Sequence, residues 1–242
     1  MTEAFDVARV DGRWRIEHAL TKLRQRGALA GAYNYDLTAH ALRQAVNAGV
    51  PRERLLAPAM PGSWMVNNRA PSSVLKAWLS DEARPAWQAL FHHLEEGPEE
   101  WVGAGADARE TVTQAVEALS RNGHQTCAVS KVLALLCPET VPLMDDAALF
   151  LMTGGAPMPK TADTPEADAS AFVPMLDTFN RAVLEAEPAL LELADHYELA
   201  PLTASQVLDR LLWFDSWGHR VVKAKWRRVE EDGLVTVSLG KE

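Results

Sequence analysis

The chain has 242 residues, enough to bury a substantial core as one large domain or as two lobes. Hydrophobic residues make up 48% of it, no apolar run is long enough to span a bilayer, and the first residues lack the basic-then-apolar pattern of a signal peptide. A net charge of −9, from 24 Lys and Arg against 33 Asp and Glu, argues against avid non-specific binding to nucleic acid. We therefore expect a globular cytoplasmic protein with no membrane partner.

The residue types that usually bind metals or phosphates occur here without the spacing that such sites need. Cys127 and Cys137 have no neighbouring Cys or His at metal-ligand spacing, so we interpret both as buried thiols. His92 and His93 are adjacent and point in different directions on a helix, which favours structural or surface roles. The glycines around residues 103–105 follow no predicted strand, which excludes a phosphate loop. We expect neither a cofactor nor a metal.

The first half of the chain has apolar residues at helical spacing. This pattern predicts helices over residues 14–26, 36–46, 72–79 and 86–94. Gly27 and Gly31 are predicted to end the first of these helices. Residues 58–71 are predicted to form an irregular connection. Three tryptophans, Trp78, Trp87 and Trp101, are expected in one apolar cluster.

A helix, a turn and a second helix are predicted over residues 107–136. Asp107 and Glu110 have the spacing of a capping box, which predicts a helix that starts there and ends before Gly123. The second helix carries Lys131 near its start. It should end at Cys137-Pro138, because a proline ring disfavours helical geometry in the residue before it.

The chain then returns through Pro142 to Asp145 and Asp146. These acids precede an apolar run, where the start of a helix favours negative charge and side-chain acceptors. Lys131 and Asp145 are 14 residues apart and are joined by a short helix and a tight return. We therefore expect their side chains to converge on one cleft.

The last third of the chain is predicted to hold a loop, three helices and a hairpin. The loop covers residues 153–170, and the helices cover 172–186, 188–196 and 203–217, the last with Thr203 as its cap. Residues 221–229 and 234–239 alternate around Asp232-Gly233 and predict a β-hairpin. The expected fold class is all-α with this small hairpin. The chain is one helical domain, with a division into lobes of about 1–105 and 106–218 left open and the hairpin in 219–242.

A lysine that opens an apolar helix, a proline, a Val-Pro pair and an aspartate that heads the next helix resemble the core of the helix-hairpin-helix DNA glycosylases. The similarity is to the 8-oxoguanine DNA glycosylase-like branch in particular. The resemblance implies that Lys131 attacks the anomeric carbon and that Asp145 supports the developing charge, with Asp146 as the rival assignment. The family's glycine-rich hairpin is absent before Lys131, and residues 122–130 take its place.

The resemblance also implies a base pocket on the last core helix. Asp209 and Trp213 are four residues apart and lie one above the other there, with Trp217 further along the same helix. Each of these residues also has a plain structural interpretation. Lys131 can be a surface residue with a packed stem, Asp145 an N-cap, and the tryptophans part of the core.

The segment of residues 219–228 is basic and contains no acid. Its Lys and Arg residues are Arg220, Lys223, Lys225, Arg227 and Arg228. As the densest basic stretch, it is the predicted contact to phosphates. The leading hypothesis is a DNA glycosylase/lyase that acts on double-stranded DNA with a damaged or modified base. The alternative is a non-catalytic helical scaffold that binds a nucleic acid, a small ligand or a protein. The oligomeric state stays open.

Overall fold

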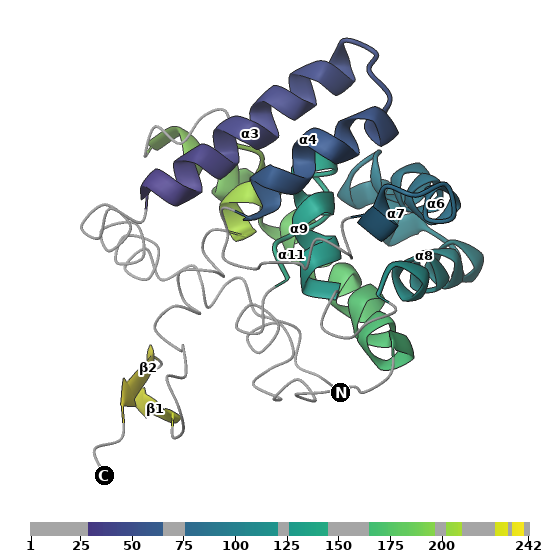
Figure 1. Ribbon diagram of the computed structural model, residues 1–242. Helices are drawn as coiled ribbons and strands as arrows, with labels where there is room; N and C mark the ends of the chain where they lie inside the picture. The colour runs from purple at the N-terminus through teal and green to yellow at the C-terminus, as the bar shows by residue number, and fades with distance from the viewer. Residues whose placement is uncertain are drawn as a thin grey trace.

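The computed structural model describes residues 29–64, 76–120, 126–144, 165–196, 202–209, 226–231 and 234–239. This part of the chain is mainly helical (Figure 1), in agreement with the predicted all-α class. The helices are α3 (Leu29–Asn47), α4 (Arg52–Trp64), α6 (Arg84–Leu94), α7 (Pro98–Gly103), α8 (Ala106–Leu119), α9 (Thr126–Leu136) and α11 (Pro165–His196). A short helical turn covers residues 204–209. Within these ranges, no helix is long and apolar enough to cross a membrane.

Helix α9 lies at the centre of the helical body (Figure 1). It contacts α3, α4, α8 and α11. Every residue from Val129 to Leu136 is buried. A helix that is apolar on nearly all sides is stable in water only when other elements surround it, which explains its position. The predicted end of this helix at Cys137-Pro138 is confirmed.

Large aromatic side chains hold α6 against α8. We call Trp78, Trp87, Phe91 and Trp101 the aromatic cluster; all four are buried, as predicted for the three tryptophans. The rings of Trp78 and Trp87 meet edge to face with centroids 5.7 Å apart, and those of Trp87 and Phe91 stack at 5.9 Å. Trp78 Nε1 donates to the Leu119 carbonyl at 2.8 Å, so the indole also ties this cluster to the end of α8. Apolar area and aromatic geometry both stabilise this layer.

Two predictions about the first helices are wrong. Helix α3 already begins at Leu29 and includes Gly31, and α4 continues through Pro58 and Pro61, where an irregular connection was expected. A proline in a helix loses one hydrogen bond and crowds the preceding turn. Packing outweighs this cost here, because α4 contacts α9 and α3, with Ala59 and Met60 buried between the prolines.

Predicted boundaries around α8 and α11 also need correction. Gly105 is the N-cap of α8 and no side chain caps it, so the capping box expected at Asp107 and Glu110 does not form. Helix α11 begins inside the predicted 153–170 loop and is continuous through Pro174 and Pro188, where two helices were expected. From Phe172 to Ala194, one face of it lies in the core. Its buried apolar residues are Phe172, Val173, Met175, Leu176, Phe179, Ala182, Val183, Ala186, Leu190 and Ala194.

Strands β1 (Trp226–Glu231) and β2 (Leu234–Leu239) pair antiparallel. The register places Trp226 opposite Leu239 and Glu231 opposite Leu234. The predicted turn at Asp232-Gly233 lies outside the described residues, as do the predicted helix over 14–26 and most of the 153–170 loop. The division of the chain into two lobes stays a prediction.

Candidate functional site

The structure places only some of the predicted site residues. Lys131 and Asp209 are both described and both buried, with 4% and 8% of their surface exposed. The other predicted site residues on helices, Asp145, Asp146, Trp213 and Trp217, lie outside the described residues. So do Arg220, Lys223 and Lys225 of the basic segment, whereas Arg227 and Arg228 lie on β1. Convergence of Lys131 with Asp145 therefore stays a prediction.

Lys131 lies within the helical core. It lies at the middle of α9 (Thr126–Leu136) and not near the helix start as predicted, and its neighbours Ser130 and Val132 are fully buried. The interpretation of Lys131 as a surface residue is therefore wrong. A lysine is almost never buried without interactions that compensate for its lost hydration, so this position is a candidate for function as well as for structure.

The chain after α9 forms a buried connection, residues 137–144, which we call the 137–144 segment. The Thr140 and Val141 N–H groups both donate to the Cys137 carbonyl, at 3.1 and 3.0 Å, and close a tight turn. Beyond that turn, residues 141–144 are in no helix or strand, yet all four are buried. Buried backbone groups need hydrogen-bond partners, and an irregular segment must find them on other elements.

Two neighbouring N–H groups of this segment find their partners on side chains. Leu143 N–H donates to Asp209 Oδ1 at 2.8 Å, and Met144 N–H donates to Ser130 Oγ at 3.1 Å. Pro142 has no N–H to satisfy. The segment that leads to Asp145 is thus held by the residue before Lys131 and by Asp209.

Further polar side chains hold the first part of the 137–144 segment. Asn180 of α11 donates to the Thr140 carbonyl at 2.9 Å, and Ser205 donates to the Glu139 carbonyl. Arg43 of α3 forms an ion pair with the Glu139 carboxylate at 2.8 Å. The segment is therefore fixed by three different parts of the chain, so its position depends on the packing of the whole helical body.

Arg52 connects the end of α9 to α6. Its Nε donates to the Leu136 carbonyl at 3.1 Å, and its Nη1 pairs with Glu95 at 2.5 Å. The neighbouring Cys137 thiol is buried, and this burial raises its pKa from the usual 9.0 to about 12, although Arg52 acts in the opposite direction. The predicted burial of Cys137 is confirmed; a protonated, enclosed thiol is a poor nucleophile.

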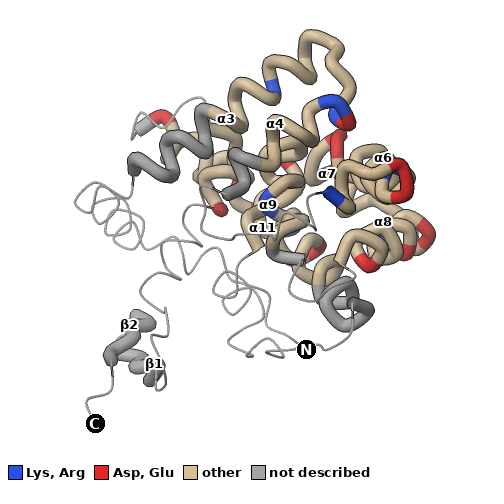
Figure 2. The backbone as a smooth tube through the Cα atoms, in the orientation of Figure 1, with Lys and Arg blue, Asp and Glu red and all other residues tan. Residues whose placement is uncertain are grey.

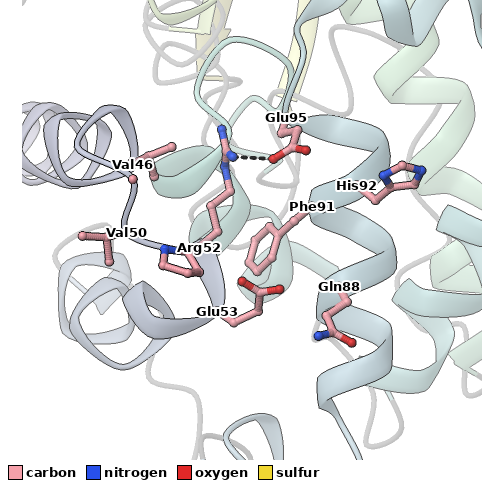
Figure 3. A pocket seen from close by; sticks show the side chains of 10 residues that line it. Val46, Val50, Arg52, Glu53, Gln88, Phe91, His92 and Glu95 are labelled. Atoms are coloured by element: carbon pink, nitrogen blue, oxygen red, sulfur yellow. Dashed lines mark hydrogen bonds and ion pairs between the residues drawn. The ribbon is translucent and has the colours of Figure 1, made fainter.

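A pocket of about 310 Å³ lies beside Arg52. Figure 3 shows Arg52 and Glu53 on one side of it, facing the α6 side with Phe91 and Glu95. The remaining lining residues are Val46, Gly49, Val50, Pro51, Gln88 and His92. The volume is at the lower end of the range for small-ligand pockets. Lys131 does not line this pocket.

Acidic residues follow α6 and lie along α7 and α8 (Figure 2). They include Glu95 and Glu96 after α6, Glu99 and Glu100 in the first turn of α7, and Asp107, Glu110 and Glu117 on α8. On α6, desolvation and the neighbouring His92 lower the pKa of His93. In the described part of the chain, no three His, Cys, Asp or Glu side chains come close enough to hold a metal ion. The negative charge of these acidic residues makes this face unsuited to contact with phosphates.

Sequence reasoning missed Ser130, Asn180 and Arg52 as contacts of the region around α9. Ser130 is the residue before the predicted nucleophile, and a polar residue in an otherwise apolar helix is a signal that was available. Asn180 and Arg52 gave no comparable signal, because their partners Thr140 and Leu136 are 40 and 84 residues away.

Comparison with family models, with curated protein sequences and with solved structures found no match.

Proposed function

We propose that the chain is a DNA glycosylase with lysine-dependent lyase activity, which flips a damaged or modified base out of a duplex and cleaves its N-glycosidic bond. The observation that carries this proposal is the burial of Lys131 beside the segment that leads to Asp145. Met144 N–H donates to Ser130 Oγ, and these residues are the sequence neighbours of Asp145 and Lys131 respectively. Because consecutive Cα atoms are about 3.8 Å apart, the two backbones approach each other next to both functional positions.

In the proposed reaction, the neutral Lys131 amine attacks C1′ of the deoxyribose. The C1′–N bond breaks, and its electron pair leaves with the base, which takes up a proton. Of the two amine protons, one is transferred to the base and the other to O4′ as the C1′–O4′ bond breaks, which opens the sugar ring and gives an imine between Nζ and C1′. Asp145, or Asp146 in the rival assignment, stabilises the positive charge that develops on the sugar. Burial of Lys131 keeps water away from the imine.

Base extrusion also needs a pocket and a contact to phosphates. Trp213 and Trp217 are proposed to stack on the extruded base, because aromatic side chains stabilise bases outside the helix. Arg220, Lys223, Lys225, Arg227 and Arg228 are proposed to contact the DNA backbone. The acidic face over α6, α7 and α8 would then point away from the duplex.

Reductive trapping tests the chemistry directly. Borohydride reduces the imine to a stable bond, so the protein should form a covalent adduct with duplexes that carry an abasic site or a damaged base. Lys131→Met has a side chain of similar length without the amine, and it should give no adduct. Lys76→Met is the matched control, because Lys76 is exposed, and it should react like the unmodified protein. An unmodified protein that traps none of the duplexes would contradict the proposal.

A second candidate is a non-catalytic scaffold, and the acidic charge and the pocket beside Arg52 favour it. Binding of a fluorescent duplex at several salt concentrations separates the two. If the basic segment contacts phosphates, replacing Lys223, Lys225 and Arg227 with Ala should weaken binding and reduce the log-log salt slope by about one unit for each lost contact. Duplex binding that yields no adduct would favour a nucleic-acid scaffold. The absence of binding at low salt would favour a small-ligand or protein scaffold.

A further inference from the structure

The helical turn of residues 204–209 contacts the 137–144 segment at two points. Thr203 Oγ1 accepts from Gln206 N–H at 3.2 Å, and Gln206 Oε1 accepts from Thr203 N–H at 3.0 Å. This reciprocal cap confirms Thr203 as the predicted start and fixes the first turn. Ser205 and Asp209 are then four residues apart and share one face. Ser205 contacts the Glu139 carbonyl and Asp209 contacts Leu143 N–H, so the two contacts are also four residues apart on the segment.

The Asp209 carboxylate points at a backbone group of its own protein. Its Oδ1 is 2.8 Å from Leu143 N, the distance of a good charge-assisted hydrogen bond, and the side chain is 8% exposed. Without this acceptor, Leu143 N–H would lose the hydrogen bond it makes here, and Leu143 is itself only 6% exposed. A buried donor left without an acceptor is costly.

We infer that Asp209 is a positioning residue: it holds Leu143 N–H and so fixes the position of residues 143–144, which precede the proposed electrostatic partner Asp145 in the sequence. This inference rests on the proposed function and replaces the base-binding role that the resemblance implies for Asp209. Ser130 contributes the neighbouring contact to Met144 N–H. Two adjacent amides, each held by a side chain from another part of the chain, fix the backbone of the two residues that precede the proposed electrostatic partner.

Positioning and direct participation make opposite demands on the Asp209 side chain. Positioning needs an acceptor oxygen at the present place, and it tolerates loss of the charge. A direct role with base, sugar or Lys131 needs the carboxylate charge, and it tolerates a small shift of the backbone contact. Asp209→Asn keeps the acceptor and removes the charge. Asp209→Glu keeps the charge and moves the acceptor by one methylene.

The experiment measures two quantities on the full chain for Asp209→Asn, Asp209→Glu and Asp209→Leu. The first is amide hydrogen exchange at Leu143, and the second is the rate of borohydride trapping on an abasic duplex. We expect Asn to stay within about threefold of the unmodified protein in both. Glu and Leu should speed exchange at Leu143 and slow trapping by about five- to tenfold or more, the value of one hydrogen bond. Asp195→Leu, at an exposed acid on α11, should change neither.

Each other outcome overturns the inference in a distinct way. Trapping that survives in Asp209→Glu but is lost in Asp209→Asn would assign the charge a direct role. Unchanged exchange at Leu143 in Asp209→Leu, or in Asp209→Glu if the Leu variant does not fold, would show that the contact holds nothing in place. If the unmodified protein traps no DNA, the proposed function fails. Exchange at Leu143 then decides alone whether Asp209 fixes the segment.

Discussion

The aromatic cluster and the 137–144 segment are both buried, but different forces hold them. In the aromatic cluster, large rings pack against one another, and the indole N–H groups of Trp78 and Trp87 donate to the Leu119 and Trp78 carbonyls. In the 137–144 segment, polar side chains from other helices bind backbone groups that no regular element satisfies. The first region depends on apolar area and on the geometry of its aromatic rings. The second depends on the position of single atoms, which is the property that a functional site needs.

The largest effect is expected in the aromatic cluster. Trp87 is fully buried, stacks on Phe91 and meets Trp78 edge to face. Trp87→Ala should lower the free energy of unfolding by about 3–5 kcal/mol, from lost apolar contact and the cavity that remains. Urea unfolding followed by circular dichroism measures this. Leu79→Ala is the control, because Leu79 is 51% exposed, and it should cost less than about 0.5 kcal/mol. Equal losses in the two variants would contradict this account of the cluster.

A smaller loss is expected where a polar side chain holds the 137–144 segment. Asn180 is fully buried and donates to the Thr140 and Leu176 carbonyls. Asn180→Ala should lower the free energy of unfolding by about 1–3 kcal/mol, because the buried Thr140 carbonyl loses this donor. Arg181→Ala, at the exposed neighbour on α11, is the control for the same unfolding measurement. If Asn180→Ala is as stable as the control, the contact to Thr140 contributes nothing.

The end of α9, the cap at Thr203 and the aromatic cluster show what the sequence could predict. Leu136 as the last helical residue follows from Cys137-Pro138, and Thr203 as a cap follows from local chemistry; both are confirmed. The aromatic cluster followed from residue size. These features depend on neighbours in the sequence or on apolarity alone.

The errors came where distant packing decides. The sequence predicted separate helices over 172–186 and 188–196, but α11 keeps its apolar face on the core and runs through Pro188. The contact between Asp209 and Leu143 spans 66 residues, and no local pattern encodes it. Asp209 was singled out through a resemblance as a base-pocket residue, which stays a prediction, and its contact with Leu143 was not predicted. A sequence indicates which polar residues are unusual, but it does not indicate which backbone group each one binds.

Cys137 provides a pH test within the 137–144 segment. Burial raises its pKa to about 12 in the folded chain, from a usual value of 9.0. Above pH 9 the unfolded thiol loses its proton while the folded thiol keeps it, so unfolding becomes more favourable as the pH rises. This thiol should lower the free energy of unfolding by about 1 kcal/mol between pH 8 and pH 10. Urea unfolding of the unmodified protein and of Cys137→Val at both values isolates the term. An identical change with pH in the two proteins would contradict it.

The smallest effect is expected for ion pairs at the edge of the helical body. Arg109 of α8 pairs with Asp177 of α11, with Nε–Oδ2 and Nη2–Oδ1 distances of 3.1 and 3.2 Å, and its guanidinium lies over the Trp101 ring at 5.4 Å. Both side chains are about one quarter exposed, so solvent screens the pair in part. A double-mutant cycle with Arg109→Met and Asp177→Asn should give a coupling energy of at most about 1 kcal/mol, which decreases as salt is added. The pair between Arg84 and Asp81 is the matched comparison, because these side chains are 62% and 84% exposed, and its coupling should be too small to measure. A coupling between Arg109 and Asp177 that salt leaves unchanged would mean that this pair is held as tightly as the contacts of the 137–144 segment. Polar contacts that depend on the position of single atoms would then also occur at the edge of the helical body.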